Sequence, residues 1–172
     1  MRSLLLTALL AAVMSVPATA QSVADEVSAD LDAAFDKLVQ LAEAVPADRY
    51  DWRPAEGVRS ISEAFVHVSS AAYFFGNMGG ISMPEELNLQ GAEENLTQKD
   101  DVIAFIRAAR EHIVSEVGGL SEGDLEAPVE WFDGSQRSTR HLMIGLAEHT
   151  SEHLGQLIAY ARMNDVTPPW SG

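Results

Sequence analysis

Two histidines lie one helical turn apart in the stretch AEHTSEHLGQLIAY, at positions 149 and 153. Leu146 precedes His149 by three residues and Leu157 follows His153 by four, so both imidazoles fall on the apolar stripe of a helix. Burying an imidazole costs free energy unless its nitrogens find partners. A metal ion would satisfy both rings, because imidazole is the commonest protein metal ligand. The spacing alone therefore indicates either a metal site or a structural pair of core histidines.

A third histidine, His67, occurs beside Ala64, Val68 and Phe74 at helical spacing. A single histidine on an apolar face is usually a core residue with satisfied hydrogen bonds. Three of them on the inner faces of two helices are better explained by a metal, since helical bundles build metal sites from facing helices. The predicted metal ligands are therefore His67, His149 and His153, and no separate catalytic residue is assigned.

The two remaining histidines are predicted to lie at the surface. His112 is flanked by Arg110 and Glu111 and falls outside the apolar stripe of its helix. His141 begins the last helix beside Arg140 and ranks fourth as a ligand. Neither belongs to the predicted site.

The segment HTSEH also matches H-x-x-E-H, the motif of inverted zinc proteases, which would make Glu152 a general base. That motif needs a third ligand well downstream, and no glutamate follows His153. Glu148 and Glu152 are spaced as neighbours on one helical face, which is typical of a solvated acidic flank. The protease interpretation is therefore disfavoured.

Four long helices are expected, over residues 22–45, 61–78, 97–117 and 139–163. Ser60 with Glu63, and Thr97 with Asp100, have the spacing of capping residues at two helix starts. The fold class is therefore all-α, a four-helix bundle.

Two connections stand out. The link between the second and third helices, which begins at Gly79-Gly80, is long for adjacent helices. It is expected either to hold a short helical turn or to cross the end of the bundle to a non-adjacent position. Asp133-Gly134 is a hairpin-turn signal, so a short β-hairpin before the last helix is also considered.

Residues 1–20 have the three parts of a cleaved signal peptide: Arg2, an apolar run, and Ala18-Thr19-Ala20. The predicted domains are this leader and one bundle domain over 21–172, and the protein is expected to be periplasmic or secreted. Removing Arg2 takes the net charge from −15 to −16, because it is the leader's only charged residue. So acidic a protein repels phosphate backbones and anionic lipid, which argues against nucleic-acid partners. The absence of cysteine excludes disulfides and a lipid-modified cysteine, so no membrane anchor is expected after cleavage.

The stretch YDWRPAEGVRSISEAFVHV, followed later by EHTSEHLGQLIAYARMNDVTPP, resembles the DinB/YfiT-like superfamily of candidate metalloenzymes. The matching positions are Trp52-Arg53-Pro54, His67, His149, His153 and Gly155-Gln156-Leu157. The resemblance implies a four-helix bundle in which the three histidines hold a divalent metal and water fills the open positions. It covers roughly residues 23–169, although the middle third matches only as a pattern.

The resemblance also bears on activity, since some members of the superfamily transfer low-molecular-weight thiols such as bacillithiol or mycothiol. An exported chain would meet little of such intracellular thiols, which counts against that reaction. The expected function is a divalent-metal-dependent enzyme of transferase or hydrolase type, acting on a small molecule, with zinc, nickel, iron or manganese as the ion. The alternative is a non-catalytic envelope metal-binding or stress-related bundle, and a homodimer is left open.

Overall fold

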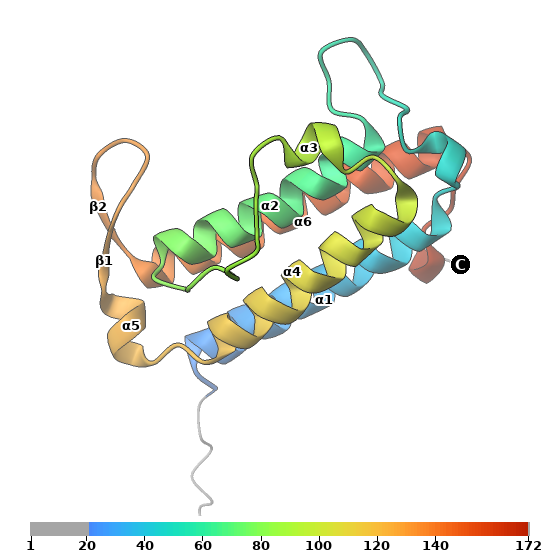
Figure 1. Cartoon of the computed structure of the whole chain (residues 1–172). Coiled ribbons are helices and arrows are strands. Elements are labelled where there is room, and N and C mark those ends of the chain that lie inside the picture. Colours follow the sequence, from blue (N-terminus) through green and yellow to red (C-terminus); the bar gives the residue numbers. More distant parts are fainter. Residues whose placement is uncertain (1–20, 172) are drawn as a thin grey trace, which may run out of the picture.

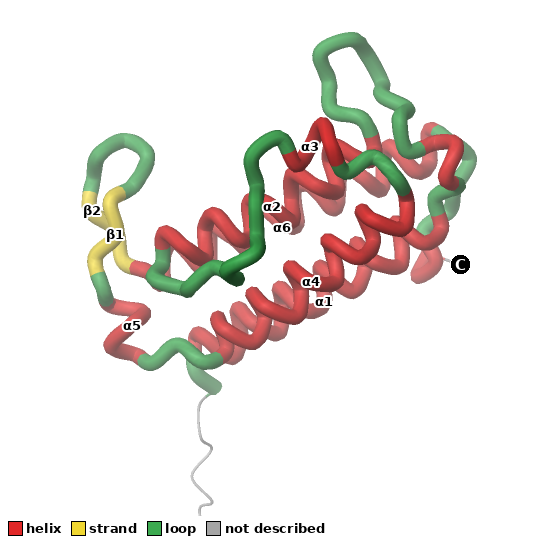
Figure 2. Tube along the Cα trace, viewed as in Figure 1, coloured by secondary structure: helices red, strands yellow, loops and turns green. Residues whose placement is uncertain are grey.

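The computed structural model describes residues 21–171, so the predicted leader lies outside the described residues. Its elements follow the chain in this order (Figures 1 and 2): α1 (Val23–Ala44), η1 (Ala47–Arg49), α2 (Ile61–Met78), α3 (Ala92–Asn95), α4 (Lys99–Gly118), α5 (Glu122–Glu126), β1 (Pro128–Glu130), β2 (Gln136–Ser138), α6 (Thr139–Met163) and η2 (Pro169–Ser171). The four predicted long helices correspond to α1, α2, α4 and α6, which confirms the all-α bundle.

Three of the four long helices, α1, α2 and α6, begin at a serine whose side chain caps the helix. Ser22 and Asp25 form a capping box at α1, and the predicted capping box of Ser60 and Glu63 begins α2. The predicted cap of the third helix by Thr97 is wrong. The N-cap of α4 is Gln98, which makes no side-chain cap hydrogen bond.

A tertiary contact accounts for the start of α4. The Nζ of Lys99 donates hydrogen bonds to the carbonyl oxygens of Glu43 and Val45, at 2.7 and 2.8 Å. These carbonyls belong to the end of α1, where helical acceptors lack partners and a cation is favoured. The first residue of α4 therefore supplies hydrogen-bond donors to the last turn of α1.

The four long helices form a ring in which α1 and α2 are diagonal partners, because each packs against α4 and α6. Figure 1 shows that α2 and α4 run in the same direction, opposite to α1 and α6. Parallel neighbours need a connection that returns along the bundle, which explains the length of the α2–α4 link. That link carries α3, the anticipated short helical turn, which packs against α2. The alternative expectation, a crossing to a non-adjacent position, is wrong, because α2 and α4 pack against each other.

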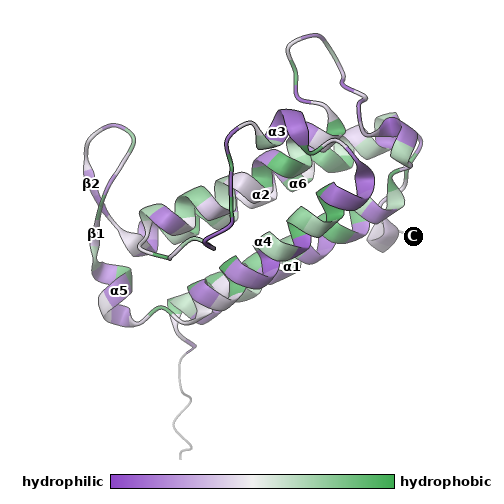
Figure 3. Ribbon diagram, viewed as in Figure 1, coloured by the Kyte–Doolittle hydropathy of each residue, from purple (hydrophilic) through white to green (hydrophobic). Residues whose placement is uncertain are grey.

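The core lies along the axis of this ring. Each long helix alternates hydrophobic and hydrophilic residues around its surface (Figure 3), and the hydrophobic ones meet inside. Fully buried members include Leu31, Phe35, Phe65, Ile106, Ile113 and Leu142. With no cysteine in the chain, this core has to stabilise the fold without disulfides.

The considered hairpin is present as an antiparallel pair, with Val129 opposite Arg137. Asp133-Gly134 does lie in the turn, and Gly134 takes the positive φ of 79° that favours glycine. The loop spans residues 131–135, however, and is longer than a two-residue turn. The hairpin leads directly into α6, whose N-cap is Ser138. It therefore sets where α6 begins.

Within the described residues, no helix combines the length and the apolar character that crossing a membrane requires.

Candidate metal centre

His67, on α2, meets His149 and His153, which lie one turn apart on the neighbouring helix α6. One ring nitrogen from each of the three lies within 4.8 Å of the others. The ring centroids are 5.4 Å apart for His67 and His149, 4.7 Å for His67 and His153, and 4.5 Å for the α6 pair. The structure thus brings together the three residues that the sequence pattern selected, from two helices.

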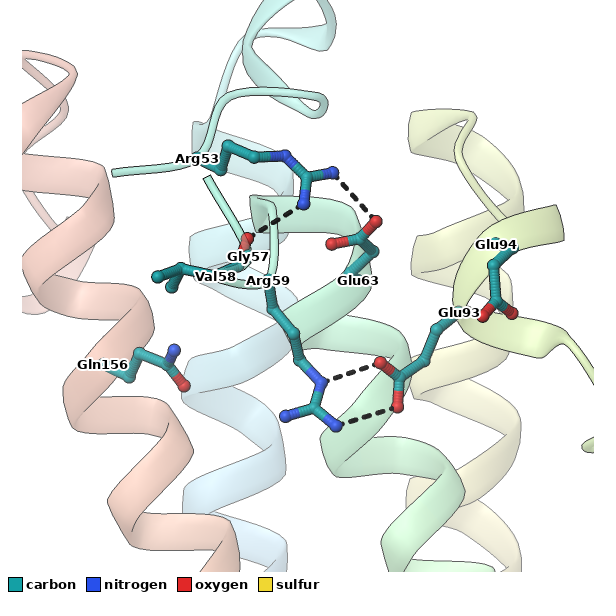
Figure 4. Close-up of a pocket in the computed structure, with 8 residues that line it drawn as sticks. All are labelled: Arg53, Gly57, Val58, Arg59, Glu63, Glu93, Glu94 and Gln156. Atoms are coloured by element: carbon teal, nitrogen blue, oxygen red, sulfur yellow. Dashed lines mark hydrogen bonds and ion pairs between the residues drawn. The ribbon is translucent and has the colours of Figure 1, made fainter. Parts of the chain in front are cut away.

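A carboxylate orients His67. Its Nδ1 lies 2.8 Å from Oε1 of Glu93, on α3. A carboxylate only accepts hydrogen bonds, so the proton is on Nδ1, and Nε2 is the nitrogen available to an ion. Arg59 in turn holds Glu93, donating from Nε at 2.7 Å and from a terminal nitrogen at 3.4 Å, as Figure 4 shows.

The amide of Gln156 orients His153. The Nδ1 of His153 donates to Oε1 of Gln156 at 2.7 Å, and Nε2 of Gln156 donates to the hydroxyl of Tyr160 at 2.8 Å. Tyr160 packs edge-on against Trp52, with ring centroids 5.5 Å apart. The Trp-Arg-Pro and Gly-Gln-Leu stretches of the sequence therefore meet behind one histidine and keep its Nε2 free for an ion.

His149 has no such support. Its Nδ1 is buried and has no hydrogen-bond partner among the described residues. Its ring lies 5.6 Å from that of Phe75, in apolar surroundings. A buried polar atom without a partner is costly in a native fold, and a ligand at this ring would remove the cost. The donor set and this orphaned nitrogen both fit a metal ion held by the three histidines.

The same surroundings keep the imidazoles uncharged. Burial lowers the pKa of His149 to about 4, and the neighbouring His153 and His67 add to the shift. Burial also lowers the pKa of His67, although the hydrogen bond that His67 donates to Glu93 opposes the shift. Burial would raise the pKa of Glu93, but the bonds from Arg59 and His67 outweigh it, and the pKa is lowered. Near neutral pH this yields two neutral imidazoles beside an ionised carboxylate.

A polar cavity of about 540 Å³ is lined by Glu93 and Gln156, the hydrogen-bond partners of His67 and His153, and Figure 4 shows the residues around it. Arg53 closes one part of it, donating to the carbonyl of Val58 and to Glu63, each at 2.9 Å. These bonds tie the loop before α2 to the first turn of that helix. The arginine of the Trp-Arg-Pro stretch thus shapes the wall of this cavity.

Glu93, Arg59 and the apolar surroundings of His149 were not anticipated from the sequence. Glu93 lies in the long connection, where no helical periodicity links it to His67. The only available signal is general: a metal-binding histidine usually donates its second nitrogen to a carboxylate or a carbonyl. Several acidic residues of the chain would have met that description equally well.

The other predicted positions also have defined places. His141 is exposed, as predicted. His112 lies outside the cluster but is only partly exposed, because its Nε2 is 2.9 Å from the carbonyl oxygen of Ser82 and tethers the long connection to α4. Glu152 is exposed, which agrees with a solvated acidic flank.

Comparison with known proteins agrees with the fold. The sequence model described as the DinB superfamily matches residues 30–157. No curated protein sequence matches the chain.

Solved structures resemble the whole bundle. The DinB-like protein YjoA from Bacillus subtilis is 20% identical, with a TM-score of 0.66 over 83% of this chain and 94% of its own. A DinB-like protein from Bacillus cereus is 15% identical, with a TM-score of 0.68 over 79% of this chain and 89% of its own. A conserved protein from Enterococcus faecalis is 15% identical, with a TM-score of 0.63 over 83% and 97%. At these identities the likeness is one of fold.

Proposed function

Because the chain belongs to the DinB superfamily, we propose that it is an exported, divalent-metal-dependent enzyme of transferase or hydrolase type. The convergence of His67, His149 and His153 carries this proposal. The three imidazoles would be the protein ligands of the metal ion, and at least one coordination position would be left for water or substrate. That composition is typical of catalytic metal sites, whereas structural sites are closed by four protein ligands.

When bound in such a site, a divalent ion supplies Lewis-acid chemistry and lowers the pKa of a coordinated water or thiol. The chain's own residues prepare that site before any ion arrives. Glu93 and Gln156 hold two of the rings through Nδ1, and burial keeps His149 uncharged. Neutral, oriented imidazoles are ready donors, because no proton has to leave them first.

The surroundings favour a small-molecule substrate. The polar cavity beside the cluster has a volume within the range of small-molecule sites. The net charge of −15 disfavours nucleic acid as a partner. Three imidazoles discriminate poorly among divalent ions, so zinc, nickel, iron and manganese all suit the site.

Metal analysis of the purified mature protein tests the metal site. One equivalent of ion per chain is expected in the wild type, and none in the double variant His149→Ala, His153→Ala. His112→Ala is the matched control and should keep its ion, because His112 lies outside the cluster. Equal metal content in the wild type and the double variant would refute the metalloprotein interpretation.

Catalysis and export need separate measurements. In a screen of hydrolase and thiol-transfer substrates, any substrate that the wild type turns over should not be turned over by His149→Ala. Tight metal binding without any turnover would support the non-catalytic alternative. N-terminal sequencing of protein from cells should begin near Gln21, and a sequence that begins at Met1 would contradict export.

A further inference from the structure

Two cavities of opposite character lie near the histidine cluster, and the histidines themselves line only the second. The polar cavity is lined by Glu93 and Gln156, the hydrogen-bond partners of two of the histidines. A second cavity, of about 350 Å³, is lined by His67 and His149 themselves and by apolar side chains of α2 and the long connection. Those apolar residues are Ala71, Phe74, Phe75 and Leu89, and we call this space the apolar cavity.

An aromatic wall leads from the protein surface into the apolar cavity. Phe74 is 49% exposed and Phe132, from the hairpin loop, is 61% exposed, and their rings stack at 6.3 Å and 15°. Phe75 contacts Phe132 at 6.0 Å on one side and His149 at 5.6 Å on the other. Large apolar side chains left together at a surface usually mark a binding site.

Unpartnered polar atoms occur at the same place. Among residues 21–171, two buried side-chain polar atoms lack a hydrogen-bond partner: Oγ of Ser70 and Nδ1 of His149. Both residues line the apolar cavity. Buried polar atoms of native proteins are nearly always paired. The proposed ion would account for the His149 ring, so the unpaired hydroxyl of Ser70 indicates a ligand with a polar atom at the inner end of this cavity.

We infer that the apolar cavity binds the body of the substrate, a small aromatic or branched aliphatic molecule whose single donor group reaches the ion. This inference rests on the proposed metal site. The volume lies at the lower end of small-molecule sites, which fits one ring or a short branched chain. The apolar walls match such a body, and the imidazoles at one end match its donor group.

A matched pair of ligands tests the inference on zinc-loaded mature protein whose metal content has been measured first. Benzohydroxamate and acetohydroxamate present the same metal-binding group and differ in a phenyl against a methyl substituent. Isothermal titration calorimetry should show benzohydroxamate binding roughly 10-fold tighter or more, as expected for burial of an aromatic ring.

Variants locate the preference in the apolar cavity. Phe74→Ala should bring the two affinities to within about 3-fold by weakening benzohydroxamate alone, since half-exposed Phe74 can be truncated without opening the core. Ala71→Leu should also weaken the binding of benzohydroxamate, because the larger side chain fills the apolar cavity. The variant should still fold, since leucine is a good helix former. Met163→Ala is the control, since Met163 is 61% exposed at the end of α6 and does not line the apolar cavity.

Three outcomes would overturn the inference in distinguishable ways. Equal affinity of both hydroxamates for the zinc-loaded wild type would refute the apolar cavity as a substrate site and leave the metal site intact. Failure of the wild type to take up metal would refute the proposed function, and this inference with it. If Phe74→Ala keeps the 10-fold preference but dissociates a dimer in analytical ultracentrifugation, the aromatic wall is a contact between copies of the chain.

Discussion

Glu93 accepts a hydrogen bond from Nδ1 of His67 at 2.8 Å, although 26 residues separate them in the chain. Arg59 donates from Nε to the other oxygen of the same carboxylate, Oε2, at 2.7 Å. The carboxylate therefore fixes both the tautomer and the orientation of the His67 ring, as acceptors behind metal-binding histidines commonly do. For an ion held by the three histidines, Glu93 would therefore be a positioning residue that acts through His67.

Replacing Glu93 should accordingly weaken metal binding without abolishing it. Glu93→Ala is expected to lower zinc affinity by about 10- to 100-fold, the usual cost of losing such a partner. Competition with a chromophoric chelator would measure the dissociation constant. Glu94→Ala is the control. Glu94 is the next residue in the chain, also lines the polar cavity, and carries the same charge as Glu93. Equal losses in both variants would show that charge matters here and the hydrogen bond does not.

The metal-free protein should lose stability as the pH falls from about 6.5 towards 4. An unfolded histidine has a pKa of about 6.5, whereas burial lowers that of folded His149 to about 4. Between these values the unfolded state binds more protons at this residue, so its contribution lowers the free energy of unfolding as the pH falls, by at most about 2 kcal/mol from pH 7 to pH 5. Urea unfolding at the two pH values would measure this.

The variant His149→Gln isolates the contribution of that residue. It should show a smaller fall in stability over the same pH range, because other buried groups still titrate but position 149 does not. A wild type and a His149→Gln variant with identical pH dependence would contradict the assigned burial of the imidazole.

Removing the metal should leave the bundle folded. The core is buried between four long helices and contains none of the three histidines, so the helices do not need the ion. Chelation should lower the melting temperature by the linkage term RT ln(1 + [L]/Kd) and leave the far-ultraviolet circular dichroism helical. A random-coil spectrum after chelation would show that the metal is required for folding.

Gly155→Ala should stabilise the protein. A Cβ at Gly155 would meet no atom within 4 Å, and the residue is exposed inside α6. Alanine in place of an exposed helical glycine is worth about 0.8–1 kcal/mol, which a thermal melt would detect.

Gly76→Ala offers the contrast within another helix. Its Cβ would lie 2.9 Å from Cδ1 of Ile113, a fully buried side chain, so the substitution forces the core to shift. It is expected to be neutral or destabilising despite the same gain in helix propensity. If both substitutions changed the melting temperature equally, the packing at Gly76 would be looser than described.

Local sequence was sufficient to predict the long helices and the faces they bury. Helix α2 has the predicted bounds because Ser60 with Glu63 begins it and Gly79 ends it, all within the same segment. The placement of His149 and His153 on one buried stripe follows from the 3.6-residue repeat alone. These features depend on residues a few positions apart, so the sequence by itself determined them.

Tertiary packing decided the rest. Helix α4 begins at Lys99, whose Nζ donates hydrogen bonds to carbonyl oxygens at the end of α1, more than 50 residues away. The predicted cap by Thr97 does not form. Glu93 reaches His67 only because the returning connection lays α3 against α2. Phe132 reaches Phe74 only because the hairpin places it there. Hydrogen bonds and ring contacts over such separations leave no periodic trace in the sequence, since their geometry exists only once the helices have packed.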